Sequence, residues 1–130
     1  MTSPAAEAVV REFWRRMASN DFASVGDVLT DDFVLEWPQS NERIRGGENF
    51  ARMNMEYPAH GPWRFEILRI VAAGEEAVSD VRVTDGVQAG RAISFFTLAQ
   101  GRIGCIVEFW PERFAAPARR QHLTEPIDPP

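Results

Sequence analysis

The fold is decided by residues 63–110, which read WRFEILRIVAAGEEAVSDVRVTDGVQAGRAISFFTLAQGRIGCIVEFW. Apolar and polar residues alternate through this stretch, which is the pattern of β-strands that have one covered face. Turn-forming pairs divide it at Gly74-Glu75, Asp85-Gly86 and Gln100-Gly101. The pattern therefore predicts four strands, at about 63–73, 76–84, 88–99 and 102–110. Because the connections are short, successive strands are expected to pair antiparallel as a meander.

Helical periodicity precedes the meander. Residues 3–19 predict a helix with Ser3 as N-cap and Pro4 at its first position, because apolar residues recur every three or four positions. Residues 22–29 predict a second, short helix, and residues 48–57 predict a third. The prolines that follow residue 57 end the third helix, since a helix does not continue through such a sequence.

One short strand is expected between the second and third helices. Thr30-Asp31-Asp32 predicts a turn, Phe33–Trp37 a strand closed by Pro38, and Gln39–Gly47 a polar loop. Helices that precede an antiparallel sheet are typical of an α+β fold. We expect a curved antiparallel sheet packed on three N-terminal helices, with a cone-shaped cavity between the two layers.

Length and charge limit the classes of protein. The chain has 130 residues, so we expect one domain over 1–130 with a C-terminal tail at 111–130, in which Ala115–Leu123 forms one or two helical turns. The formal net charge of -5 makes nucleic acid and anionic membranes poor partners. The opening MTSPAAEAVV lacks the basic and apolar regions of a signal peptide, and we expect a soluble, cytoplasmic protein.

Residue counts exclude several kinds of chemistry. The chain has no lysine, so neither a Schiff base nor the phosphate-binding lysine of a P-loop is available. Cys105 is the only cysteine, and the two histidines, His60 and His122, lie far apart in the sequence. An intrachain disulfide and a cysteine zinc site are therefore excluded. With no recognisable cofactor motif present, we expect neither a cofactor nor a metal.

Three motifs, taken in order, resemble the nuclear transport factor 2-like superfamily. They are Asn20-Asp21 with Leu29–Phe33, then Leu35–Pro38 with Ile44-Arg45-Gly46, then Gly101-Arg102-Ile103 with Val107–Trp110. The tail segment WPERFAAPAR, residues 110–119, is most similar to the SnoaL-like branch, which includes polyketide cyclases. The resemblance implies the cone-shaped α+β fold. It does not decide the function, because the superfamily contains isomerases, cyclases, epoxide hydrolases, dehydratases and non-catalytic binding proteins.

The resemblance argues against ketosteroid isomerase chemistry. Ketosteroid isomerases of this fold use an aspartate base before the proline that closes the first strand, and Trp37 occupies that position here. Their first-helix tyrosine corresponds to Phe13 and their protonated aspartate to Ser94. All three functional groups are changed.

Two other chemistries of the superfamily depend on carboxylates. Epoxide hydrolases need an Asp-Arg-Asp network, but Asp80 and Arg82 alternate with valines and are expected to face away from the cavity. Polyketide cyclases use an acid near the end of the last strand, and the nearest equivalent is Glu108.

Glu108 is the candidate catalytic residue. The resemblance places the face of Ile106, Glu108 and Trp110 toward the cavity, with Trp37 and Phe96 around the carboxylate. Desolvation in such a pocket raises the pKa of a carboxyl group, which suits a general acid or base. The alternative interpretation, in which Glu108 pairs with an arginine or lies at a wet rim, stays open.

Three further polar side chains are candidates for orienting a ligand. Asn54 and Tyr57 follow the inner side of the third helix, and Ser94 is expected to point inward. Asn54 is equally suited to satisfying a backbone group, and Tyr57 to a position at the rim. His60 lies in a Pro- and Gly-flanked loop, where a solvated histidine is the default interpretation and a general base the alternative.

Two functions remain open from the sequence. The first is binding of a small apolar or aromatic ligand, with acid–base isomerase, cyclase or dehydratase chemistry at Glu108. The second is a non-catalytic ligand-binding or assembly domain whose cavity is filled by side chains. On the other face of the sheet, Ile93 and Phe95 predict a homodimer, because exposed apolar sheet faces usually mark interfaces.

Overall fold

The computed structural model describes residues 5–128, and the predicted caps Ser3 and Pro4 lie outside them. The elements in chain order are α1 (Ala5–Ala18), the 3-10 helix η1 (Phe22–Val28), β1 (Leu29–Trp37), β2 (Glu42–Arg45), α2 (Gly46–Glu56), β3 (Arg64–Ala73), β4 (Glu76–Thr84), β5 (Ala89–Ala99), β6 (Arg102–Phe109) and the 3-10 helix η2 (Ala118–Leu123). The expected order of helices before an antiparallel meander is confirmed.

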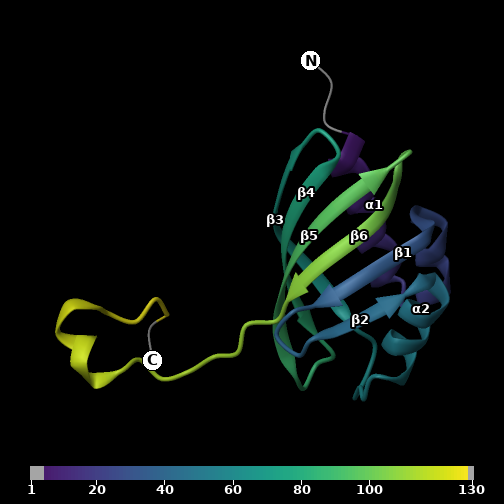
Figure 1. Cartoon of the computed structure of the whole chain (residues 1–130). Helices are drawn as coiled ribbons and strands as arrows, with labels where there is room; N and C mark the ends of the chain where they lie inside the picture. Colours follow the sequence, from purple (N-terminus) through teal and green to yellow (C-terminus); the bar gives the residue numbers. More distant parts are fainter. Residues whose placement is uncertain (1–4, 129–130) are drawn as a thin grey trace.

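A single curved sheet holds the six strands in the order β2-β1-β6-β5-β4-β3, with α1 and α2 on one side of it (Figure 1). β3 to β6 pair antiparallel with their neighbours in the chain, as the alternation predicts. The β5–β6 turn holds Gln100 and Gly101 at φ 54° and 79°, the positive angles that tight hairpins require. β1 pairs parallel with β6, so the sheet is mixed rather than purely antiparallel.

The structure differs from the prediction between residues 30 and 45. Thr30-Asp31-Asp32 is not a turn but part of β1, at a place where the register between β1 and β6 shifts. Bulged strands tolerate turn-forming residues, because the ladder is interrupted there. The predicted polar loop 39–47 contains β2, a four-residue edge strand whose only buried residue is Ile44. A strand this short shows no alternation that a sequence pattern can detect.

The core lies between α1, α2 and the concave face of the sheet. α1 buries Ala6, Val10, Phe13, Trp14 and Met17, which follow the predicted helical spacing. The ring of Phe13 packs against Phe50 of α2 and Phe96 of β5, with centroid separations of 5.9 and 5.4 Å. Each fully buried side chain of this size contributes roughly 1.5–3 kcal/mol. Much of the concave face that the sequence assigned to a cavity is thus covered by aromatic side chains.

Residues 111–128 form a segment that we call the C-terminal arm. It leaves the sheet at the end of β6 and runs away from the rest of the chain (Figure 1). Its one helical element is η2, which lies within the region expected to form helical turns. Of the helices in residues 5–128, none has the length and apolar character needed to span a bilayer.

Candidate functional site

Glu108 occupies the inner face of β6, near the end of the strand. Ile106 and Glu108 are buried, whereas Val107 and Phe109 are only partly covered on the outer face. The exposed fraction of Glu108 is 6%. The alternation of the strand therefore sends this carboxylate into the interior of the fold, as the sequence and the resemblance predict.

Three neutral donors surround the carboxylate. The indole N–H groups of Trp37 and Trp110 both donate to Oε1 of Glu108, at 3.0 and 2.9 Å. The hydroxyl of Ser94 lies 2.7 Å from the other oxygen, Oε2. β1, β5 and β6 thus each contribute to the site, because these strands are neighbours in the sheet and Ser94 lies directly opposite Glu108. We call these four residues the Glu108 cluster.

The donors determine where a proton can sit on Glu108. An indole nitrogen donates a hydrogen bond and cannot accept one. Oε1 of Glu108 must therefore remain an acceptor in every protonation state that keeps both indole contacts. Oε2 faces a hydroxyl that can either donate or accept. Any proton on Glu108 is consequently carried by Oε2, on the side of Ser94.

Burial raises the pKa of Glu108 above its ordinary value, and the hydrogen bonds from Ser94, Trp37 and Trp110 oppose part of that rise. No ion pair described within residues 5–128 includes Glu108, so the alternative interpretation of an arginine partner is not supported. The carboxylate is held by hydrogen bonds from neutral groups alone. Such an environment favours the protonated form more than a salt bridge would.

A row of polar side chains continues from Glu108 across the inner face. Ser79 of β4 pairs with Ser94 of β5, and Ser94 pairs with Glu108 of β6. Both serines are fully buried, and the indole N–H of Trp14 donates to the Ser79 hydroxyl at 3.0 Å. Sequence reasoning missed Ser79 and Trp14. The register of the predicted meander would have revealed the row, since it sets the three residues side by side.

The other predicted site residues take no part in the hydrogen bonds of the Glu108 cluster. The Asn54 amide donates to the carbonyl of Phe50 at 2.8 Å, so it satisfies its own helix. Tyr57 is exposed, and its ring packs edge-on against Trp63. Phe96 is buried on the inner face of β5 but packs against Phe13 of the core.

His60 belongs to a separate cluster that joins two loops. The buried carboxylate of Asp85 accepts the backbone N–H of His60 at 2.8 Å and lies 3.2 Å from its Nδ1. Val87 and Gln88 donate to the same carboxylate. These hydrogen bonds hold the pKa of Asp85 well below its ordinary range against the opposing effect of burial. The arrangement fixes the loops before β3 and after β4.

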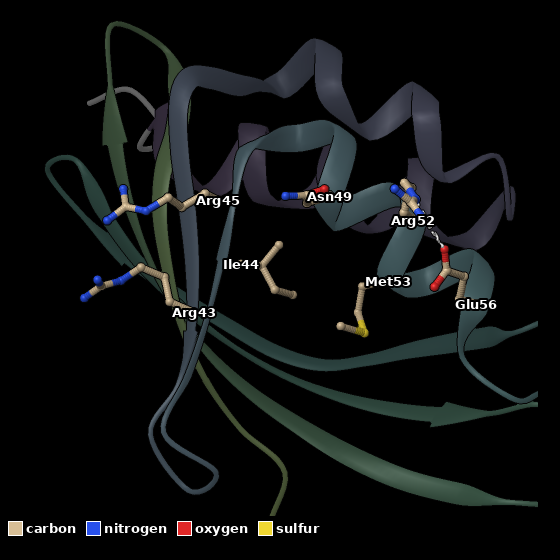
Figure 2. A pocket seen from close by; sticks show the side chains of 7 residues that line it. All are labelled: Arg43, Ile44, Arg45, Asn49, Arg52, Met53 and Glu56. Carbon is tan, nitrogen blue, oxygen red and sulfur yellow. Dashed lines mark hydrogen bonds and ion pairs between the residues drawn. The ribbon is translucent and has the colours of Figure 1, made fainter.

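Two surface hollows flank α2. One, of about 250 Å³, lies between β2 and α2, where Ile44 and Met53 face each other while Arg43 and Arg45 point away (Figure 2). The other lies between η1 and α2. Neither hollow is lined by Glu108, Trp37 or Trp110. A ligand that reaches the Glu108 cluster must therefore enter elsewhere.

Several solved structures share this arrangement of sheet and helices. A proposed ketosteroid isomerase from Kribbella flavida is 29% identical, with a TM-score of 0.87 over 96% of this chain and 91% of that one. An NTF-2 like protein of unknown function from Burkholderia xenovorans is 23% identical, with a TM-score of 0.78 over 95% of this chain and 96% of that one. An LEH-like epoxide hydrolase from M. tuberculosis is 24% identical, with a TM-score of 0.67 over 82% and 83% of the two chains.

The search of curated proteins found no match. A family model, by contrast, matches residues 10–105, a stretch that runs from α1 to β6. The model describes the SnoaL-like domain. Matched over most of its length, the chain belongs to the SnoaL-like domain family.

Proposed function

We propose that the protein binds a small, largely apolar molecule at the Glu108 cluster and that Glu108 exchanges a proton with it. The observation that supports this proposal is a buried carboxylate that is held only by neutral donors. Its raised pKa brings it toward the range in which a carboxyl group both gives and takes protons near neutrality.

A purely structural role explains this carboxylate poorly. A buried ionised group costs free energy unless an opposite charge compensates it. A glutamine of the same shape would make the same three hydrogen bonds, because its carbonyl would accept from both indoles and its amide would donate to Ser94. A carboxylate at this position therefore lowers the stability of the fold relative to glutamine. Ionisable groups in such environments concentrate at functional sites.

Access to the cluster is supported by the exposure of its tryptophans. Trp110 is 36% exposed, and Trp37 is partly buried. Both indoles donate to Oε1 at the end of β6, where the chain leaves the sheet. A ligand that displaces one indole would place its own polar atom beside the carboxylate and its apolar body against the exposed rings.

The reaction type that fits is proton transfer at a carbonyl compound, of the isomerase, cyclase or dehydratase kind. Glu108 would remove a proton from a carbon next to the carbonyl and return it at another position. A proposed ketosteroid isomerase and a proposed SnoaL-like polyketide cyclase from Jannaschia are among the structures with this fold. The changed residues at Trp37, Phe13 and Ser94 argue for a substrate other than that of the ketosteroid isomerases.

The second candidate is a non-catalytic binding or assembly domain. It is favoured by the aromatic packing of the concave face around Phe13, Phe50 and Phe96. It is also favoured by the outer face of the sheet, where Val71, Val78, Phe95 and Val107 lie opposite one another across four strands. Val71 is 63% exposed and Phe95 is 45% exposed. With either function, we propose that this row, called the outer row below, forms a homodimer interface.

Solvent hydrogen exchange separates the two candidates. Wild type and Glu108→Gln are incubated in D₂O with a panel of steroid ketones, polyketide-like aromatic ketones and aromatic acids, and deuterium in each compound is followed by NMR. Binding is measured in parallel by the rise in Tm. Glu75→Gln, which changes an exposed glutamate of the β3–β4 turn, is the matched control.

The expected result is a compound that raises the Tm of all three proteins but gains deuterium only with wild type and Glu75→Gln. Equal exchange with Glu108→Gln would exclude Glu108 as the proton-transfer group. A compound that binds wild type without any exchange would favour the non-catalytic candidate.

A further inference from the structure

The C-terminal arm carries apolar side chains that the other described residues, 5–128, leave exposed. Phe114 is 79% exposed and Ile127 is 98% exposed, and Leu123 in η2 is as exposed as Phe114. The hydrogen bonds described for residues 111–128 join residues of the arm to one another. Just before the arm begins, the backbone N–H of Trp110 donates to Oε1 of Gln39, in the turn between β1 and β2, at 2.8 Å.

An isolated arm of this kind lacks a source of stability. η2 is six residues long, and helices of this length are marginal in water without tertiary contacts. Three large apolar side chains in water forgo roughly 1.5–3 kcal/mol each that burial would supply. The arm thus has the composition of a segment that packs against a surface, although it extends away from its own domain (Figure 1).

The chain itself offers a matching surface. The outer row runs from Val107 of β6 to Val71 on the edge strand β3, and both Phe95 and Val71 are exposed. Two such rows facing each other across a two-fold axis cover their central residues, Phe95 above all. Val71, at the end of the row, remains at the rim of that contact, where a second apolar element is needed to cover it.

We propose that the arm of each copy reaches across a homodimer and packs Phe114, Leu123 and Ile127 against the rim of the partner copy's outer row, around strand β3. The inference rests on the homodimer proposed above and adds the exchange of arms to it. Each copy then covers with its arm the apolar residues that the other exposes, and the exchange is symmetric.

The length of the arm permits this reach. The seven residues 111–117, which precede η2, form neither helix nor strand and can extend to roughly 23 Å. Within one copy, β6 and β3 are three strand spacings, or about 14 Å, apart, and a sheet packed face to face lies about 10 Å away at right angles to that direction, so a β3 strand of a facing partner copy lies within this reach. Pro111 and Pro117 restrict the backbone at both ends of this segment, which lowers the entropy lost when the arm is held in one position.

The arm also has a counterpart in a solved structure. The alignment with the Kribbella flavida protein covers 96% of the 130 residues, so only about five lie outside it. The arm is longer than five residues, and the aligned region therefore extends into it.

Photo-crosslinking between labelled and unlabelled copies tests the exchange. Full-length chains carry benzoylphenylalanine at position 114 or 123, and ¹⁵N-labelled and unlabelled chains are mixed, unfolded in urea and refolded together before irradiation, so that mixed-isotope dimers form. Mass spectrometry then identifies the joined peptides. The expected result is mixed-isotope cross-links from the arm to β3, and none from a control at position 56, on the exposed side of α2. Cross-links confined to one isotope would show that the arm folds back on its own chain and would overturn the proposal.

A charge variant measures the contribution of the arm to association. The double variant Leu123→Asp, Ile127→Asp is compared with Gln121→Asp, Thr124→Asp, which adds the same charge to polar positions of the arm. We expect the first to weaken dimerisation at least about tenfold and the second to change it little. If both variants dimerise as tightly as wild type, the arm exchange is wrong while the homodimer stands. A full-length chain that is monomeric in sedimentation at high concentration would overturn both.

Discussion

Ser94 lies directly opposite Glu108 in the β5–β6 ladder, and its hydroxyl is 2.7 Å from Oε2, the only carboxylate oxygen that no indole contacts. This pairing gives the two oxygens of one side chain different tasks. Oε1 is a fixed acceptor, and Oε2 is the oxygen that gains or loses a proton.

Replacing Glu108 by glutamine should stabilise the protein at neutral and alkaline pH. Glutamine copies the protonated acid, with its carbonyl at Oε1 and its donor facing Ser94. The pKa of Glu108 is raised in the fold, so the contribution of this group to stability is fully present below the ordinary value of 4.5 and is lost as pH rises through the folded value. We expect Glu108→Gln to exceed wild type in free energy of unfolding at pH 8, by roughly 1.4 kcal/mol for each unit by which the fold raises the pKa of Glu108. Urea unfolding at several pH values measures the difference.

The control for this experiment is Glu75→Gln, whose side chain is exposed. Its free energy of unfolding should follow that of wild type at every pH. A constant difference between Glu108→Gln and wild type from pH 4 to pH 8 would mean that the carboxyl group does not titrate differently in the folded state.

Removing the Ser94 hydroxyl should destabilise the protein and raise the pKa of Glu108 further. The hydroxyl is one of the groups that lower this pKa, so the pKa should rise when the hydroxyl is removed. Its removal also leaves the buried Oε2 without a hydrogen-bond partner, which costs stability. We expect Ser94→Ala to cost about 1–3 kcal/mol at pH 7. A double-mutant cycle with Glu108→Met, which removes both carboxylate oxygens and so removes the contact with Ser94, should show coupling between the two positions. Strict additivity of the two free-energy changes would contradict the contact.

Asp85 should stabilise the loops that it joins, and its effect should depend on acid. Its pKa is lowered in the fold, so its contribution is present above the ordinary value of 3.8 and is lost as pH falls below that value. Asp85→Asn replaces one of the two acceptor oxygens with an NH₂ group, which is itself a donor and would face the backbone N–H of His60 or of Gln88, so the variant should lower the Tm at pH 7. Asp31→Asn, on an exposed position of β1, is the control and should change the Tm far less. The gap between the two variants should narrow below pH 3.8.

Charge in the middle of the outer row should prevent self-association without unfolding the chain. Phe95 is 45% exposed and packs edge-on against Phe109 at 6.1 Å, so the monomer tolerates its replacement. We expect Phe95→Asp to be monomeric by light scattering at concentrations where wild type is dimeric. Val87→Asp introduces the same charge at an exposed apolar residue of the β4–β5 loop and should leave the dimer intact. A dimeric Phe95→Asp would place the interface elsewhere.

Alternation and turn residues were sufficient to predict the meander, and the resemblance to the superfamily implied the inward direction of Glu108. The alternation also predicts that Asp80 faces outward, and its two neighbours in the strand, Ser79 and Val81, are indeed buried on the inner face. The alternation does not show that Asp80 is nevertheless 8% exposed, covered by the guanidinium of Arg91 at 2.6 Å. That contact joins neighbouring strands, and a pattern along one strand carries no information about which residue lies diagonally across from it.

Other misses have similarly specific causes. β2 presents a single apolar residue, Ile44, and one residue defines no period. The spacing of Asn54 places it on the inner side of α2 but does not reveal that its amide would turn back to the Phe50 carbonyl four residues earlier. The roles of Trp14 and Ser79 depend on a contact over 65 positions of sequence, which only the packed fold supplies.

Trp110 connects the Glu108 cluster to the C-terminal arm. Its indole is one of three groups that hold Glu108, and the next residue is the first of the arm. When the arm is bound to a partner copy, the indole of Trp110 is held against Glu108. When the arm is released and the indole moves away, Glu108 loses one hydrogen-bond donor and its pKa rises further. The pKa of Glu108 would then differ between the monomer and the dimer.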